Sequence, residues 1–96
     1  MTLEKEQALI VIQQSLLGEV SAFLRAVTIR VSDGHLHFDA YYDGLIHEND
    51  VESMSCVETE LIAALPERIR VTHSLYRIDS PSILPKTDIF VYLRRE

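Results

Sequence analysis

Two periods of hydrophobic and polar positions follow one another along this chain, and each predicts a different kind of element. From Leu3 to about Leu17, apolar residues recur every three or four positions, which predicts an amphipathic helix. Thr2 is a candidate N-cap, and Gly18 suits the C-terminal stop because glycine adopts a positive φ at no steric cost. The first element is therefore a helix with one apolar face.

An Asp-Gly turn then joins two alternating runs. The run at 22–32 is rich in β-branched residues and predicts a strand, and the run at 35–42 predicts a second one. Asp33-Gly34 between them predicts a β-hairpin with a type I′ turn, in which both central residues have positive φ. Alternation assigns the side chains of the second strand to two faces: Leu36, Phe38, Ala40 and Tyr42 inward, and His35, His37, Asp39 and Tyr41 outward.

A second helical period follows the Asp-Gly turn at 43–44. It predicts a helix that begins at about 48 or 50 and ends at 65, before Pro66. Asn49 and Glu52 have the spacing of a capping box, with His47 as the alternative cap. Six residues form the expected buried stripe of this helix: Val51, Met54, Val57, Leu61, Ala64 and Leu65.

Two more alternating runs predict strands at 69–79 and 88–94. The segment between them contains Pro81 and Pro85, which lack the backbone donor that a strand interior needs. Alternation turns one set of each run inward, apolar except for His73: Ile69, Val71, His73 and Leu75 in the first run, and Ile89, Val91 and Leu93 in the second.

These elements predict one α+β domain, residues 1–96, in the order α-β-β-α-β-β. We expect a four-stranded, antiparallel-rich sheet with both helices packed on one face and the other face open to water. The strand order stays open. Polar and aromatic residues would line the open face: Thr28, Arg30, His37, Asp39, Tyr41, Thr72, Ser74, Tyr76, Phe90 and Tyr92.

Acidic residues are concentrated in one part of the chain. Between Val31 and Glu67 there are nine acidic residues and no Lys or Arg, so this window has a charge of −9. The rest of the chain, with six acids and nine bases, has a charge of +3, which gives the total of −6. Such a field accelerates encounter with a basic protein. A pI near 5.1 argues against nucleic acid as a partner, because phosphate binding relies on Lys and Arg.

Neither export nor a membrane is indicated. The N-terminal apolar patch is interrupted by Glu4, Glu6 and two Gln, and no small-residue cleavage site follows. Cys56 is the only cysteine, which excludes an internal disulfide and suits a reducing compartment. We therefore expect a soluble, cytoplasmic protein.

Candidate chemistry is sparse. His35-x-His37-x-Asp39 places two imidazoles and a carboxylate on one side of a strand, where they could bind zinc, but a solvated polar face is the favoured interpretation. Cys56 is interpreted as a structural thiol and His73 as a hydrogen-bonded core histidine. Because no phosphate loop or nucleophile motif occurs, we expect neither enzymatic activity nor a cofactor.

Several short motifs resemble one family of small bacterial proteins. They are YYDG from Tyr41, E-x-D-x-E from Glu48, S-C-V-x-T-E-x-I-A from Ser55, Y-R-I-D-x-P from Tyr76, and V-Y-L-R-R-E from Val91. On these motifs the chain resembles the immunity proteins of contact-dependent growth inhibition and related polymorphic toxin systems. The resemblance covers most of the chain, from the first helix to Glu96.

The resemblance implies that the protein binds and inhibits the C-terminal domain of one cognate toxin, often a basic nuclease. Acids that stand in for phosphates, beside tyrosine anchors, would suit such a partner. The partner-binding candidates are Asp39, Tyr41, Asp43, Glu48, Asp50, Glu52 and Glu58. The main alternative is a non-enzymatic scaffold that forms a homodimer or binds an unknown partner. A sheet that binds nucleic acid would need Lys and Arg around it, and this chain lacks such a basic surface.

Overall fold

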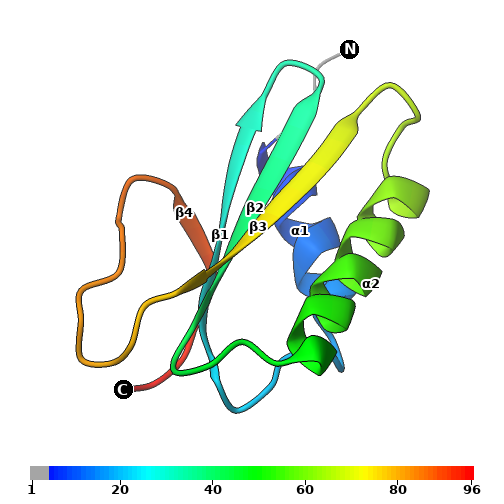
Figure 1. The fold of residues 1–96 in the computed structure, drawn as a ribbon. Helices are drawn as coiled ribbons and strands as arrows, with labels where there is room; N and C mark the ends of the chain where they lie inside the picture. The colour runs from blue at the N-terminus through cyan, green and yellow to red at the C-terminus, as the bar shows by residue number, and fades with distance from the viewer. Residues whose placement is uncertain (1–4) are drawn as a thin grey trace.

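The computed structural model describes residues 5–96 and contains the six predicted elements in the predicted order (Figure 1). Gly18 follows the first helix with φ 82°, the positive value that a helix stop of this kind requires, while the proposed cap Thr2 lies outside the described residues. The elements are α1 Lys5–Ser15, β1 Leu24–Ser32, β2 His35–Tyr42, α2 Glu48–Ala64, β3 Arg70–Arg77 and β4 Ile89–Leu93.

The strands form one mixed sheet in the order β3-β2-β1-β4. β1 pairs antiparallel with both β2 and β4, whereas β2 and β3 are parallel. A parallel pair needs a crossover connection, and α2 supplies it. The predicted α+β fold with an antiparallel-rich sheet is confirmed, and the sheet is mixed because the strands before and after α2 run in the same direction.

Both helices pack on one face of the sheet, as predicted (Figure 1). Their apolar faces and the inward side chains of the strands form the main core, which includes Ile12, Leu36, Phe38 and Met54. Leu36, Phe38 and Tyr42 are at most 1% exposed, so the alternation assigned to β2 is confirmed. Burying each apolar side chain of this size stabilises the fold by about 1.5–3 kcal/mol.

The face of the sheet opposite the helices, here called the far face, is only partly open to water, contrary to the prediction. β3 and β4 lie at opposite edges of the sheet, so their connection has to cross one face, and the helices occupy the other. Residues 78–88 therefore cover part of the far face, where Thr28 is 1% exposed. A second hydrophobic cluster lies under this segment and consists of Ala26, Tyr41, Leu84, Ile78 and Phe90.

The buried stripe of α2 is narrower than predicted. Val51 is 48% exposed and Ala64 is also exposed, so both were wrongly assigned to the core. The stripe continues instead to Asp50, which is 5% exposed. Spacings of four and three residues keep the buried positions on one line along the helix, and Val51 falls beside it, whereas Ala64 continues the spacing but is the last residue of α2. The other predicted positions are confirmed: Met54, Val57, Leu61 and Leu65.

Two local features also differ from simple alternation. Gly34 has φ 69° but Asp33 has no positive φ, so the hairpin turn is present without being type I′. A shift of register in the pairing of β1 with β4 lets the consecutive residues Val91 and Tyr92 both pack against the main core. Leu93, predicted inward, is 59% exposed because the shift resets the alternation.

Candidate functional site

The seven partner-binding candidates lie on two sides of the sheet. Asp39 and Tyr41 belong to β2 and point to the far face, whereas the others lie on α2 or on the loop that leads to it: Asp43, Glu48, Asp50, Glu52 and Glu58. The structure does not bring all seven into one surface. Their individual surroundings show which of them a partner can reach.

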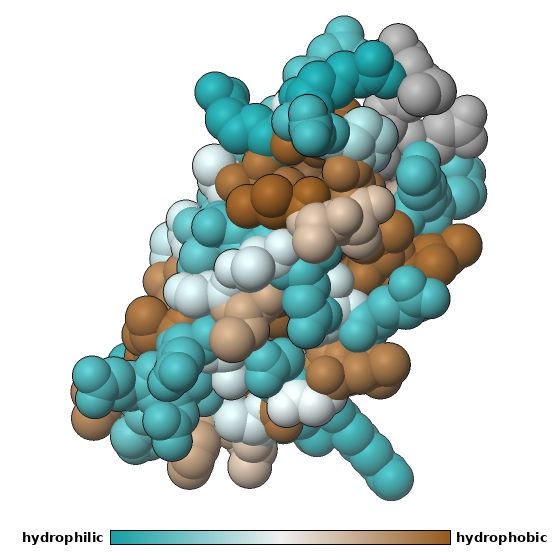
Figure 2. Space-filling model, turned by 90° about the vertical axis from the view of Figure 1, so that its right-hand side faces the viewer, coloured by the Kyte–Doolittle hydropathy of each residue, from teal (hydrophilic) through white to brown (hydrophobic). Residues whose placement is uncertain are grey.

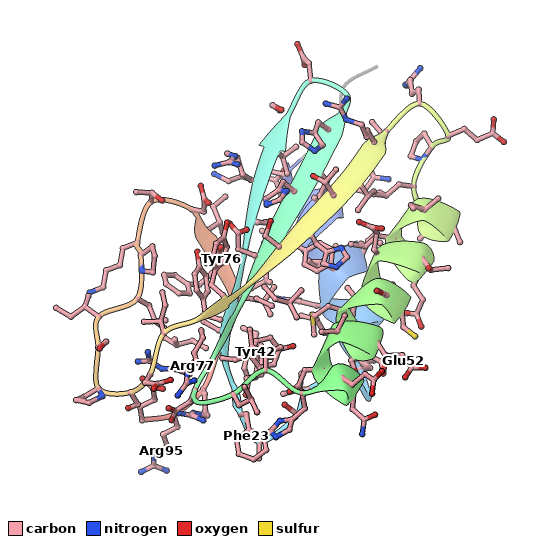
Figure 3. All side chains as sticks on the ribbon, in the orientation of Figure 1. Phe23, Tyr42, Glu52, Tyr76, Arg77 and Arg95 are labelled. Carbon is pink, nitrogen blue, oxygen red and sulfur yellow. The ribbon has the colours of Figure 1, made fainter. Side chains whose placement is uncertain are left out.

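Asp39 and Tyr41 are nearly enclosed. Asp39 is 7% exposed, and its Oδ1 lies 2.8 Å from Nε2 of His37. Tyr41 is 5% exposed and stacks on Tyr76, with 5.6 Å between the ring centroids and 21° between the ring planes. Burial is the main cause that raises the pKa of the Tyr41 hydroxyl above its ordinary value. Tyr76, which is 45% exposed, is the ring of this pair that a partner can reach (Figure 3).

The His35-x-His37-x-Asp39 pattern forms a hydrogen-bonded network on the far face. Oγ1 of Thr72 lies 2.7 Å from both His35 Nε2 and His37 Nδ1, and the second nitrogen of His37 contacts Asp39. Within residues 5–96, no group of three or more His, Cys, Asp or Glu side chains is placed to hold a metal ion. Because Asp39 is buried and both histidines are only partly exposed, the pattern forms a hydrogen-bonded polar network and not the solvated face that was predicted.

Acidification is expected to destabilise the protein through His35. Desolvation lowers the pKa of His35 below its ordinary value of 6.5, and the charge of Arg70 acts in the same direction. Because the unfolded chain then binds the proton first, the free energy of unfolding falls as the pH drops below 6.5. Urea unfolding of the native protein and of His35→Asn at about pH 7.5 and about pH 5.5 measures this loss, which the variant should lack in part. An NMR titration midpoint for His35 above its ordinary value contradicts the expectation.

Asp43 belongs to an ion-pair network that we call the C-terminal network. Its Oδ2 accepts a hydrogen bond from Nη2 of Arg94 at 3.0 Å, and its Oδ1 accepts one from the backbone N–H of Ser80 at 3.2 Å. Arg94 also donates to Glu96 at 2.9 Å, and Glu96 accepts from the buried Arg25 at 2.6 and 2.7 Å. The charge of Asp43 is therefore compensated within the fold.

Asp50 caps α2. Its Oδ2 accepts a hydrogen bond from the backbone N–H of His47 at 3.1 Å, so the capping box joins His47 to Asp50 and not Asn49 to Glu52. The carboxylate also lies at the positive end of the helix macrodipole. At 5% exposure, Asp50 stabilises the start of α2 and presents little surface to a partner.

Replacing Asp50 by alanine is expected to lower the free energy of unfolding by about 1–2 kcal/mol, because the His47 N–H loses its acceptor. Glu52→Ala is the matched control on the exposed side of the same helix, and it should change the free energy of unfolding by no more than about 0.5 kcal/mol. Urea denaturation of both variants measures the difference. Equal losses in the two variants would show that Asp50 does not act as a cap.

Glu58 is engaged with β3. Its Oε1 lies 2.8 Å from Nδ1 of His73, whose ring stacks on Phe38 with 5.0 Å between centroids and 12° between planes. This confirms the interpretation of His73 as a histidine at the core that is hydrogen-bonded to a neighbour. Glu58 is thus less available to a partner than its place in the acidic window suggests.

Glu48 and Glu52 are the two candidates that stand exposed, and neither has a hydrogen bond or an ion pair within the part of the chain that the structure describes. They are one helical turn apart on the outer side of α2. Glu52 borders a hollow of about 330 Å³ together with Glu19 from the connection between α1 and β1. Cys56 lines the same hollow and is exposed, so it is not part of the buried stripe of α2.

Apolar side chains flank these carboxylates. Phe23 is 47% exposed and its ring lies against that of His47, with 5.4 Å between the centroids and a tilt of 42° between the planes. Val51 is 48% exposed and follows His47 by one helical turn. Figure 2, which faces the side of the molecule that carries α2, shows hydrophobic groups interrupted by hydrophilic ones, and Figure 3 shows Phe23 and Glu52. The term α2 surface denotes the following residues: Glu19, Phe23, Glu48, Val51, Glu52, Cys56 and Glu60.

Two members of the α2 surface, Glu19 and Phe23, were not among the predicted candidates. The predicted helix to about Leu17 and the predicted strand at 22–32 took up apolar residues at both ends of this connection, whereas α1 ends at Ser15 and β1 begins at Leu24, which leaves apolar residues in the connection between them. Three such residues are exposed at 17–23, with exposed fractions of 78% for Leu17, 40% for Val20 and 47% for Phe23. Exposed apolar side chains that are rimmed by polar ones are typical of interaction sites.

Comparison with known proteins places the chain in a family. In the described residues, no helix combines the length and the apolar character that a bilayer-spanning helix needs. A search of curated proteins finds no match. The family model described as MafI2 immunity protein matches residues 5–96, which is nearly the whole chain. The chain therefore belongs to the MafI2 immunity protein family, a family of small bacterial immunity proteins of the polymorphic toxin type.

Proposed function

We propose that this immunity protein neutralises its cognate toxin by binding the toxin's C-terminal domain through the α2 surface, and that this domain is a basic nuclease. One observation carries the proposal: in a chain of an immunity family, Glu48 and Glu52 stand exposed, with no ion pair in the part of the chain that the structure describes, on a surface that also carries half-exposed apolar residues. Exposed apolar side chains that lie together with polar ones are typical of protein interaction sites.

The electrostatics of α2 support a cationic partner. Glu48 and Glu52 are separated by four residues, a spacing at which like charges destabilise a helix by about 0.2–0.5 kcal/mol per pair. The last turn of α2 carries no basic residue that would complement the macrodipole, and Glu60 lies toward that end. A lysine or arginine from a partner relieves both unfavourable terms. These acids are therefore better suited to a complex than to the free protein.

A nuclease is the toxin class that fits this charge. Proteins that bind DNA or RNA present Lys and Arg to the phosphates. Carboxylates on the α2 surface can take the place of those phosphates, which gives fast association through opposite fields and specificity through the positions of the charges. The inhibitor has to act in the compartment where the nuclease meets nucleic acid, so we infer that the protein is cytoplasmic.

A homodimer through the same surface is the second candidate function, and the charge disfavours it. Symmetric dimers use the same patch on both copies. Such an interface would place Glu48 and Glu52 of one copy against the acids of the other. Like charges that face each other across an interface weaken binding by about 2 kcal/mol or more. A heterologous basic partner avoids this repulsion.

Co-expression with the toxin domain encoded next to this chain tests the proposed function. Cells that produce the toxin domain are expected to stop growing and to resume growth when this protein is present. The two chains should then purify together, and the purified complex should no longer degrade RNA or DNA that the free toxin degrades. Growth arrest that persists despite equal amounts of this protein rules out neutralisation of that toxin. If the free toxin degrades neither RNA nor DNA, the proposed toxin class is wrong.

A further inference from the structure

A pocket lies on the far face, on the other side of the sheet from the α2 surface. It has a volume of about 270 Å³ and is bordered by side chains from three strands and from the 78–88 connection. Tyr41 and Tyr76 line it as a stacked pair, together with Pro85 and Asp88 from the connection. The pocket thus combines an aromatic wall with charged groups.

The charged groups of this pocket are incompletely paired. Asp39 and Asp88 supply two carboxylates and Arg30 supplies one guanidinium; Asp39 already contacts His37, so Asp88 is the carboxylate that depends on Arg30. The side chain of Asp88 is only 15% exposed, yet its ion-pair partner Arg30 lies 3.8 Å away, which is longer than a hydrogen bond. The side chain of Arg30 is 63% exposed and is therefore held weakly. A largely desolvated carboxylate with such a distant partner favours a closer cation.

We propose that this pocket binds an arginine side chain of a second protein partner, distinct from the toxin. Tyr76 and Asp88 both line the pocket, so a guanidinium in it has a tyrosine ring to pack against and a carboxylate that accepts its hydrogen bonds. Lysine is a poorer match because its compact, strongly hydrated ammonium neither stacks nor donates in a fork. The incoming arginine takes the place of Arg30 in the ion pair with Asp88, and the side chain of Arg30 then turns toward solvent.

This inference is independent of the proposed function. The pocket and the α2 surface lie on opposite faces of the sheet, since the helices cover one face and residues 78–88 cross the other (Figure 1). A segment bound at Tyr76 leaves Glu48 and Glu52 free. The protein can therefore hold a toxin and a second, arginine-bearing segment at the same time, and failure of one interaction says nothing about the other.

NMR titration with capped tripeptides tests the arginine pocket. Acetyl-Gly-Arg-Gly-amide is expected to shift the signals of Tyr76 and Asp88 with a dissociation constant on the order of 1–10 mM, as one side chain contributes only a small part of an interface. The counterpart with citrulline, which has the same shape without the charge, should shift them far less. The lysine counterpart should bind more weakly than the arginine peptide.

Two variants give opposite predictions that a general loss of structure cannot produce. Asp88→Asn is expected to weaken binding of the arginine peptide by about threefold to tenfold, because the neutral amide loses the charge-assisted hydrogen bonds. Arg30→Met removes the resident competitor and should tighten binding by about threefold to tenfold. The inference is overturned if the citrulline or lysine peptide binds as tightly as the arginine peptide, or if Arg30→Met leaves the affinity unchanged or lower.

Discussion

Reversing Glu48 and Glu52 to lysine is expected to weaken toxin binding by about 10²- to 10³-fold. Each reversal replaces an attraction by a repulsion, and about 1.4 kcal/mol at each position already multiplies to a hundredfold loss. Both side chains are exposed and unpaired within the described residues, so the fold should tolerate the change. Titration calorimetry or surface plasmon resonance with the cognate toxin domain measures the loss.

The control for this experiment is the double variant Asp33→Lys/Glu67→Lys, which changes the net charge by the same amount. Asp33 is exposed in the hairpin turn and Glu67 after α2, both outside the α2 surface. We expect this control to retain most of the affinity and to lose only a part of the long-range steering. Added salt should weaken the native complex and strengthen that of Glu48→Lys/Glu52→Lys. Equal losses in the two double variants would assign the effect to net charge alone.

Replacing Arg25 by alanine is expected to lower the free energy of unfolding by about 2–4 kcal/mol, because buried hydrogen-bond acceptors lose their donor. Arg25 is 2% exposed and donates to the carbonyl oxygen of Ile78 at 2.6 Å and to that of Ser82 at 3.0 Å. It also holds the carboxylate of Glu96 with two hydrogen bonds. One side chain thus joins β1, the 78–88 connection and the C-terminal residue.

Urea denaturation measures this loss, with Arg95→Ala as the matched control. Arg95 is exposed, and Figure 3 shows it pointing away from the fold. Its replacement should change the free energy of unfolding by no more than about 0.5 kcal/mol. Arg25→Lys should rescue little, because an ammonium cannot reproduce the planar fork of donors. If Arg25→Ala is as stable as Arg95→Ala, the C-terminal network does not stabilise the protein.

The same network gives a dependence on pH with a defined sign. The hydrogen bonds from Arg25 are the main cause that lowers the pKa of the Glu96 side chain from 4.5 to about 2. A lowered folded-state pKa means that the stabilisation is fully present above 4.5 and is lost as the pH falls toward 2. The difference in stability between the native protein and Glu96→Gln should accordingly be largest near neutral pH and vanish in strong acid.

The sequence predicted the elements well where a short-range pattern decides the structure. Strict alternation placed Leu36, Phe38 and Tyr42 in the core, and the helical period placed Met54 and Leu61 there. The parallel pairing of β2 with β3 and the crossing of residues 78–88 over the far face depend on contacts between distant segments. No local period encodes such contacts, so the far face was expected to be open.

The candidate site was harder to predict because a count of acids says nothing about their partners. Asp43 lies 51 residues before the arginine that pairs with it, and Glu58 lies 15 residues before His73. Asp50 looked like its neighbours in the acidic window, yet it is buried as a helix cap. Only the structure separates these engaged acids from Glu48 and Glu52, on which the proposed interface now rests.

Chemical labelling of Cys56 tests the central claim most directly. Cys56 is exposed on the α2 surface next to Glu52 and Glu19, and it is the only cysteine of the chain, so a maleimide reports on this surface alone. The control is the double variant Cys56→Ser/Ile83→Cys, which moves the thiol to the connection that crosses the far face. The native Ile83 is 83% exposed, so a cysteine at this position is accessible to the maleimide. Toxin binding through the α2 surface should slow the labelling of Cys56 by at least about tenfold and leave the control unchanged. Labelling of Cys56 at the same rate in the free protein and in the saturated complex would contradict the account.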